Sequence, residues 1–188
     1  MKIVLVVLAV LVLVGVLLGG SLMSARNELV AEHEAVQSAW SQVDVVLQRR
    51  ADLIPNLVET VKGAAGHEEK VINDVTSARA AMMGAKTPAE KIQANSQLDQ
   101  ALGRLMVVVE NYPNIKANEN FQRLQDELAG TENRIAVERR KYNEVVQRYN
   151  TDIALFPKNI AAGMFGFHRE DAYFKADTAA KEPPKVKF

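Results

Sequence analysis

The pattern of apolar and polar residues divides the chain into two parts at about residue 24. Residues 3–23 contain no charged side chain, and Ser21 is their only polar one. As an α-helix rising about 1.5 Å per residue, this run is roughly 30 Å long, close to the hydrocarbon thickness of a bilayer. The pattern predicts a transmembrane anchor over residues 1–24, followed by a soluble helical domain.

A cleaved signal peptide is the alternative interpretation of this segment. Lys2 supplies a short basic region, and Gly19, Gly20 and Ser21 are small residues at which a peptidase could cut. We favour a retained anchor because the apolar run is longer than a usual signal-peptide core and no Ala-x-Ala site follows.

Gly15 and Gly19 form a G-x-x-x-G that favours close packing of two membrane helices. The alternative is that glycine is simply common in such helices.

From residue 25 onward the apolar residues recur with helical spacing. The first series has gaps of three, four and seven: Leu29, Val36, Trp40, Val43, Leu47 and Ile54. Pro55 lacks a backbone N–H and clashes with the preceding turn, which predicts a kink or break at residues 52–55. Asp52 would then cap a second helix over residues 55–83. Its inward residues would be Leu57, Val61, Ala64, Val71, Val75, Ala78 and Met82.

Two further helices are expected. Thr87, Pro88 and Glu90 form a capping box that predicts the start of the third helix, which should end before Tyr112 and Pro113. The fourth helix is predicted over residues 117–156 by a heptad-like series: Phe121, Leu124, Leu128, Ile135, Tyr142, Val145, Tyr149 and Phe156. Long helices with short connections predict an all-α fold: an N-terminal transmembrane helix and, over residues 25–156, an elongated antiparallel bundle of three or four helices.

The C-terminal part has a different composition. Residues 157–174 are rich in large apolar side chains: Met164, Phe165, Phe167, Tyr173 and Phe174. Three interpretations stay open, in which these side chains cap the bundle, contact a neighbouring subunit or enter the membrane interface. Residues 175–188 are polar and interrupted by prolines, which predicts a flexible tail.

Composition removes several classes of function. Lys and Arg together number 23, as do Asp and Glu, so the formal net charge is zero, unlike the basic charge of a nucleic-acid-binding domain. The chain has no cysteine, which excludes disulfides, thiolate metal sites and a lipid attached to cysteine. The three histidines lie on separate segments without the i, i+4 spacing of a helical metal site. No nucleophile elbow or P-loop occurs, and we predict neither a cofactor nor an enzymatic activity.

A polar group around the predicted kink is the main candidate contact site. Arg49 and Asp52 are three residues apart and can pair on a helix surface. Alternatively, Arg49, Arg50, Asp52 and Pro55 form a contact with another subunit or partner, whose carboxylates the arginines would bind bidentately. Phe165 and Phe167 are the other candidate contact residues. Of the many amides, such as Asn118, Asn120, Asn133, Asn143 and Asn150, a few are expected to fix helix register in the core.

The chain resembles the LemA family of bacterial membrane proteins over nearly its whole length. The resemblance is carried by many short motifs in a fixed order: WSQVD (40–44), RRADLIPNLVETVKG (49–63), HE (67–68), ENYP (110–113), KAN (116–118), LQ (124–125), GTENRI (130–135), YN (142–143), YNT (149–151), FP (156–157) and FGF (165–167). It implies an N-terminal single-pass anchor and an elongated helical bundle without enzymatic activity. A magnetosome-forming relative in the family suggests a role in membrane organisation.

Two functional hypotheses follow. The first is a scaffold that self-assembles at the bacterial inner membrane and organises or stabilises the envelope, with membrane lipid and further copies of the chain as partners and no nucleic acid. The second is a monomeric adaptor that presents its bundle to a membrane enzyme or sensor. Lys2 and the α-amino group precede the anchor, whereas Arg26 is followed mostly by acids. This slight positive-inside bias favours a periplasmic bundle.

Overall fold

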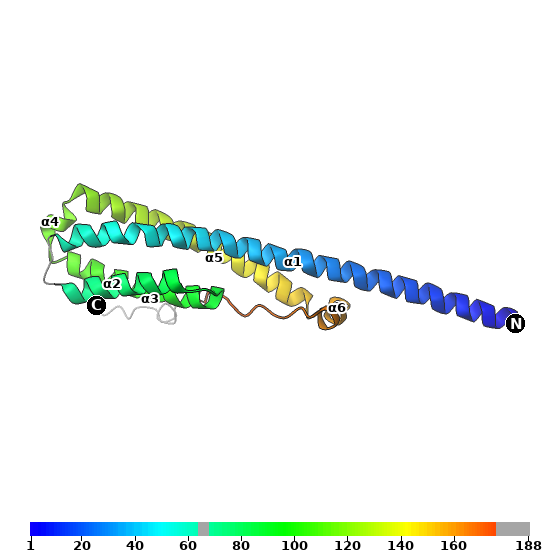
Figure 1. The fold of residues 1–188 in the computed structure, drawn as a ribbon. Coiled ribbons are helices and arrows are strands. Elements are labelled where there is room, and N and C mark those ends of the chain that lie inside the picture. Colours follow the sequence, from blue (N-terminus) through cyan, green and yellow to red (C-terminus); the bar gives the residue numbers. More distant parts are fainter. Residues whose placement is uncertain (64–67, 176–188) are drawn as a thin grey trace, which may run out of the picture. The chain divides into compact units, whose positions relative to one another are not determined.

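A computed structural model describes residues 1–63 and 68–175, so the predicted flexible tail lies, apart from residue 175, outside the described residues. Over the described ranges the fold is all-α and has no strand, as predicted (Figure 1). The helices are α1 (Lys2–Lys62), α2 (Glu69–Gly84), α3 (Pro88–Val109), α4 (Pro113–Lys116), α5 (Glu119–Asp152) and α6 (Lys158–Phe165).

Helix α1 runs through Pro55 without interruption, so the predicted break at residues 52–55 and the separate helix over residues 55–83 are wrong, while a kink at Pro55 stays a prediction. Asp52 is an exposed residue inside the helix and caps nothing. Pro55 cannot donate a backbone hydrogen bond to the carbonyl of Ala51, which is fully buried. The side chain of Arg79 on α2 donates instead, with its Nε 2.8 Å from the Ala51 oxygen. This substitute donor explains how a helix interior accommodates the proline.

By their internal contacts the residues form two compact units. The first combines Met1–Trp40 with Lys141–Asp171, and the second combines Ser41–Arg140 with the described residues from Ala172 on. In the second unit, α2 and α3 lie side by side (Figure 1). One apolar core joins α1, α2, α3, α4 and α5 there, and its most buried side chains include Ile54, Leu57, Val75, Leu98, Leu105, Ile115 and Phe121. This is the bundle-like packing that the apolar spacing predicts.

The first unit packs the middle of α1 against the end of α5 and α6. Its buried residues are Leu29 and Val36 from α1, Tyr142, Val146 and Tyr149 from α5, and Ala161 and Ala162 from α6. The Trp40 ring contacts Tyr142 edge to face, with centroids 5.3 Å apart, and His33 contacts Tyr149 at 5.7 Å. Aromatic contacts therefore make up much of this smaller core.

The observed helix boundaries agree best with the predicted ones where a short sequence motif determines where the helix begins. Thr87 Oγ1 accepts a hydrogen bond from the Glu90 amide at 3.2 Å and Glu90 Oε2 accepts one from the Thr87 amide at 3.1 Å, confirming the capping box. Hydrogen bonds from the amides of Lys86 and Thr87 lower the pKa of Glu90. By contrast, α5 ends at Asp152 instead of residue 156, and Phe156, which we expected in the seam, is 79% exposed.

Candidate functional site

The N-terminal segment is the first feature with an evident functional meaning. Among the described residues, α1 is the one helix long and apolar enough to cross a membrane, and none of its most apolar stretch is buried within the chain. The large apolar side chains of residues 3–18 are all exposed. Because so much uncovered apolar surface is unfavourable in water, the segment is a candidate membrane span.

Gly15 and Gly19 lie one turn apart on this segment. A Cβ built at either position would meet no atom within 4 Å. No other described part of the chain therefore packs on this face, and a second apolar helix could approach its backbone closely.

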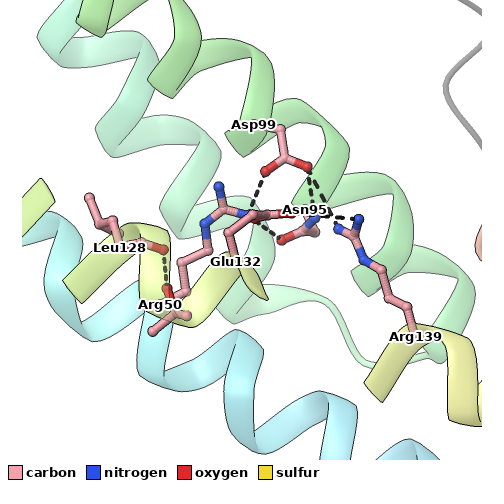
Figure 2. A network of polar contacts seen from close by, with 7 residues as sticks. Arg50, Asn95, Asp99, Leu128, Glu132 and Arg139 are labelled. Atoms are coloured by element: carbon pink, nitrogen blue, oxygen red, sulfur yellow. Dashed lines mark hydrogen bonds and ion pairs between the residues drawn. The ribbon is translucent and has the colours of Figure 1, made fainter. Parts of the chain in front are cut away.

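A charge network around the buried Arg50 joins three helices in the second unit, and its carboxylates are partly exposed (Figure 2). The side chain of Arg50 is only 8% exposed. Its Nη1 lies 2.5 Å from Asp99 Oδ1 on α3 and 2.8 Å from Glu132 Oε2 on α5, and it donates to Asn95 Oδ1 at 3.3 Å. Asn95 in turn donates to the second oxygen of Asp99 at 3.0 Å. We expected partner carboxylates at Arg50, but this structure supplies them from the same chain.

Arg139 completes the charge balance of this network. Its guanidinium lies 3.7 Å from Asp99 and 4.0 Å from Glu132, so two arginines face two carboxylates (Figure 2). Removing a charge from water is costly unless opposite charges and hydrogen bonds compensate it. Compensation within the network is consistent with a structural role, in which Arg50 holds α1, α3 and α5 in one register.

The other candidate residues near Arg50 lie on the surface. Arg49 contacts Glu127 of α5 at 3.4 Å and keeps 64% of its side chain exposed, so its pairing carboxylate is not Asp52 as the spacing predicted. Pairs of this kind contribute at most about 1 kcal/mol. Asp52 and Pro55 are exposed. A contact of these residues with a partner stays a prediction.

A second charge cluster lies in the first unit, where α6 meets α1. Lys158 Nζ is 2.5 Å from Asp152 Oδ2, 3.1 Å from Glu28 Oε2 and 3.1 Å from Glu32 Oε1. Burial alone lowers the pKa of Lys158, but the hydrogen bonds to Asp152, Glu32 and Glu28 outweigh it and raise the pKa above its ordinary value. The ammonium group therefore stays charged and joins the start of α6 to α1.

Two of the carboxyl groups around Lys158 interact with one another. Burial and a hydrogen bond with Asp152 raise the pKa of Glu32. The hydrogen bonds with Glu32 and Lys158 lower the pKa of Asp152. On acidification Glu32 is therefore protonated before Asp152, and its proton can bridge the pair.

The segment after α6 is fastened to the end of α5. Gly166, at a φ of 76°, ends α6 in the left-handed conformation that glycine adopts readily. Tyr149 donates to the carbonyl of His168 at 3.0 Å, and burial raises the pKa of Tyr149. The amide of Asn150 donates to the Glu170 carbonyl at 2.7 Å and accepts from its N–H at 2.9 Å. Asn150 therefore fastens this non-helical segment to α5, and a role of the amides in fixing helix register stays a prediction.

The candidate aromatics lie in two environments. Phe165 is 42% exposed, and the guanidinium of Arg26 on α1 lies 5.4 Å from its ring centroid. Phe167 is half-buried and its amide donates to the carbonyl of Ala162.

Sequence reasoning missed Lys158, Glu32 and Asn95, because their partners come from segments far away along the chain. The one local signal was a charged or amide residue within an apolar helical series, as at Asn95.

Comparison with known proteins gives consistent matches. The family model described as "LemA family" matches residues 39–188. "Magnetosome protein MamQ 2" of Paramagnetospirillum magneticum is 29% identical, covering 87% of this chain and 69% of the relative. "Magnetosome protein MamQ" of Magnetospirillum gryphiswaldense is 27% identical over the same shares. "Protein LemA" of Metamycoplasma hominis is 24% identical over 73% of this chain and 63% of its own. The match to the family model covers most of the chain, which therefore belongs to the LemA family.

Proposed function

We propose that this protein is a non-enzymatic helical scaffold that is anchored in the bacterial inner membrane by residues 3–23. Copies of the chain assemble with one another there and organise or stabilise the envelope. The bundle lies on the periplasmic side, because Lys2 precedes the anchor whereas Arg26 is followed mostly by acids.

The observation that carries the proposal is the uncovered face of the anchor at Gly15 and Gly19, where a Cβ built on either glycine would meet nothing within 4 Å. Lipid tails are as apolar as leucine, so membrane helices associate chiefly where small residues allow close backbone contact. One helix per chain cannot satisfy this face by itself, and a second copy offers the same face in return.

The soluble part supplies a second, weaker contact. A shallow groove of about 320 Å³ between α1 and α5 is lined by Val45, Val46 and Val137 among polar neighbours. The exposed stretch with Arg49, Asp52 and Pro55 stays our prediction for a polar contact beside it. Because all copies share one membrane, their effective concentration is high, and contacts of low intrinsic affinity suffice.

The test is the number of copies per particle of the full-length protein in lipid nanodiscs, measured by light scattering. Wild-type protein should form a discrete species larger than a dimer. Gly15→Leu combined with Gly19→Leu should shift it towards smaller species without abolishing assembly, because the soluble contacts remain.

The matched control is Ala9→Leu combined with Gly20→Leu. At about 100° per residue, Ala9 and Gly20 share a line that lies roughly 110° around the helix from Gly15 and Gly19, so both variants add two leucines to the anchor on different faces. The control should assemble as the wild type does. A wild-type monomer or dimer would refute the scaffold and favour the adaptor hypothesis, and equal effects of the two variants would exclude the glycine face.

A further inference from the structure

Residues 155–165 carry a concentration of exposed apolar side chains. Five of these eleven residues are large, apolar and exposed: Leu155, Phe156, Ile160, Met164 and Phe165. Elsewhere in the described residues beyond position 24, the exposed large apolar residues are scattered over several elements: Val30, Val45, Met83, Val107 and Val137. Single exposed apolar residues are ordinary, whereas a contiguous group indicates an interaction surface.

The two faces of α6 differ in what they contact. Ala161 and Ala162 are buried, and Lys158 is held by its three carboxyl partners, so this face packs against the rest of the first unit. Ile160 and Met164 are four residues apart and share the opposite face, which is exposed. Phe156, four residues before Ile160, extends the apolar surface beyond the start of α6. We call Leu155, Phe156, Ile160, Met164 and Phe165 the α6 patch.

The position of α6 along α1 indicates what covers the patch. Phe165 contacts Arg26, and Lys158 contacts Glu28 and Glu32. Arg26 and Glu32 follow Met23, the last residue of the apolar run, by about 4.5 Å and 13 Å along the helix axis. A headgroup layer extends roughly 5–8 Å beyond the hydrocarbon on each side. These contacts lie within one compact unit together with the anchor, so the end of α6 at Phe165 lies at the level of the headgroups, while Lys158 at its start reaches Glu32 beyond them.

The charges around the patch indicate which kind of contact forms. Between residues 155 and 171, Lys158 and Arg169 balance Glu170 and Asp171. The Lys158 cluster adds the carboxyl groups of Glu28, Glu32 and Asp152 nearby. A surface without excess positive charge does not recruit anionic headgroups, and burial of apolar side chains is then the attractive contribution.

We propose that the α6 patch is a second membrane contact, at which its apolar side chains insert at the boundary between headgroups and acyl chains of the bilayer that residues 3–23 span. The patch fixes the angle at which α1 leaves the membrane, because an anchor with one point of attachment can tilt and one with two cannot do so freely. This inference rests on the membrane anchor that the proposed function also requires, and it does not depend on self-assembly.

The test uses the absence of cysteine from the chain, which lets a single introduced cysteine carry an environment-sensitive fluorophore. Met164→Cys is the test position in the full-length protein, reconstituted in phosphatidylcholine vesicles with or without lipids that carry a quencher at the top of the acyl chain. Ser21→Cys is the positive control within the anchor. Ser38→Cys is the negative control, because Ser38 is exposed on α1 about 22 Å beyond Met23.

We expect strong quenching at residues 21 and 164 and little at residue 38. Replacing one fifth of the phosphatidylcholine by phosphatidylglycerol should leave the quenching at residue 164 unchanged. Quenching at residue 164 as weak as at residue 38 overturns the proposal. A probe at residue 164 that is shielded from water but unaffected by quencher lipids also overturns it and assigns the patch to another copy of the chain. Loss of quenching at residue 21 refutes the anchor itself, and with it the proposed function.

Discussion

The hydrogen bond between Arg79 and the Ala51 carbonyl allows a sharp test of how α1 accommodates Pro55. Replacing Arg79 by alanine leaves a buried carbonyl without either its side-chain donor or a backbone donor. A buried polar group without a partner costs about 1–3 kcal/mol. For a domain of this size that corresponds to a decrease in melting temperature of about 2–12 °C.

Pro55→Ala changes the outcome because alanine restores the backbone N–H that can bond to Ala51. In the Pro55→Ala background, Arg79→Ala should therefore cost at least about 1 kcal/mol less than in the wild type. The assay is thermal and urea denaturation of all four proteins in mild detergent, followed by circular dichroism at 222 nm. Helicity before the transition should be the same for all of them.

Arg104→Ala is the matched control. Arg104, like Arg79, contacts a neighbouring helix, but its partner is the carboxylate of Asp74 at 3.3 Å, and both of these side chains are substantially exposed. Its replacement should cost less than about 1 kcal/mol in either background. Costs of Arg79→Ala that agree within about 0.5 kcal/mol in the two backgrounds would refute the reasoning, because they would mean that the two sites are independent.

Two further predictions concern the charge clusters. Arg50→Ala should cost roughly 2–4 kcal/mol, since it leaves Asp99 and Glu132 facing one another, whereas the neighbouring Arg49→Ala should cost less than about 1 kcal/mol; similar urea midpoints for the two variants would contradict this. The raised pKa of Glu32 means that its contribution to stability is present below its unfolded pKa and is lost as pH rises through the folded pKa. Glu32→Gln cannot lose a proton, so its melting temperature relative to the wild type should increase between about pH 4 and pH 7. Glu34→Gln, at an exposed neighbour, is the control, and a pH-independent difference for Glu32→Gln would contradict the assignment.

The sequence predicted best what short-range chemistry determines. The capping box at Thr87 and Glu90 needs only four consecutive residues, and the apolar run of residues 3–23 is visible directly. Of the inward positions predicted along α5, Phe121, Leu124, Leu128, Ile135, Tyr142 and Tyr149 are buried. The same series placed Val145, three residues after Tyr142, in the core, but Val146, four residues after Tyr142 on the same helix face, is the buried residue.

The predictions that were wrong concern residues whose environment is determined by contacts with segments far away in the sequence. The predicted break at Pro55 followed from local stereochemistry, which Arg79 offsets by donating to the carbonyl of Ala51, 28 residues earlier in the chain. Arg50 was assigned to a partner because Asp99 and Glu132 lie on other helices, and their approach is set by packing. The same holds for Lys158, whose position beside α1 makes the α6 patch a neighbour of the membrane.

The most direct test of the account is whether the full-length chain is held in the membrane by residues 3–23. Membranes from cells that produce it should be washed with high salt and then with alkaline carbonate, and the retained protein analysed by intact mass spectrometry. Because burial of apolar side chains is insensitive to salt and to high pH, we predict that the protein stays in the membrane pellet with residues 1–24 present. Release into the supernatant, or a mature N-terminus near residue 22, would contradict the account.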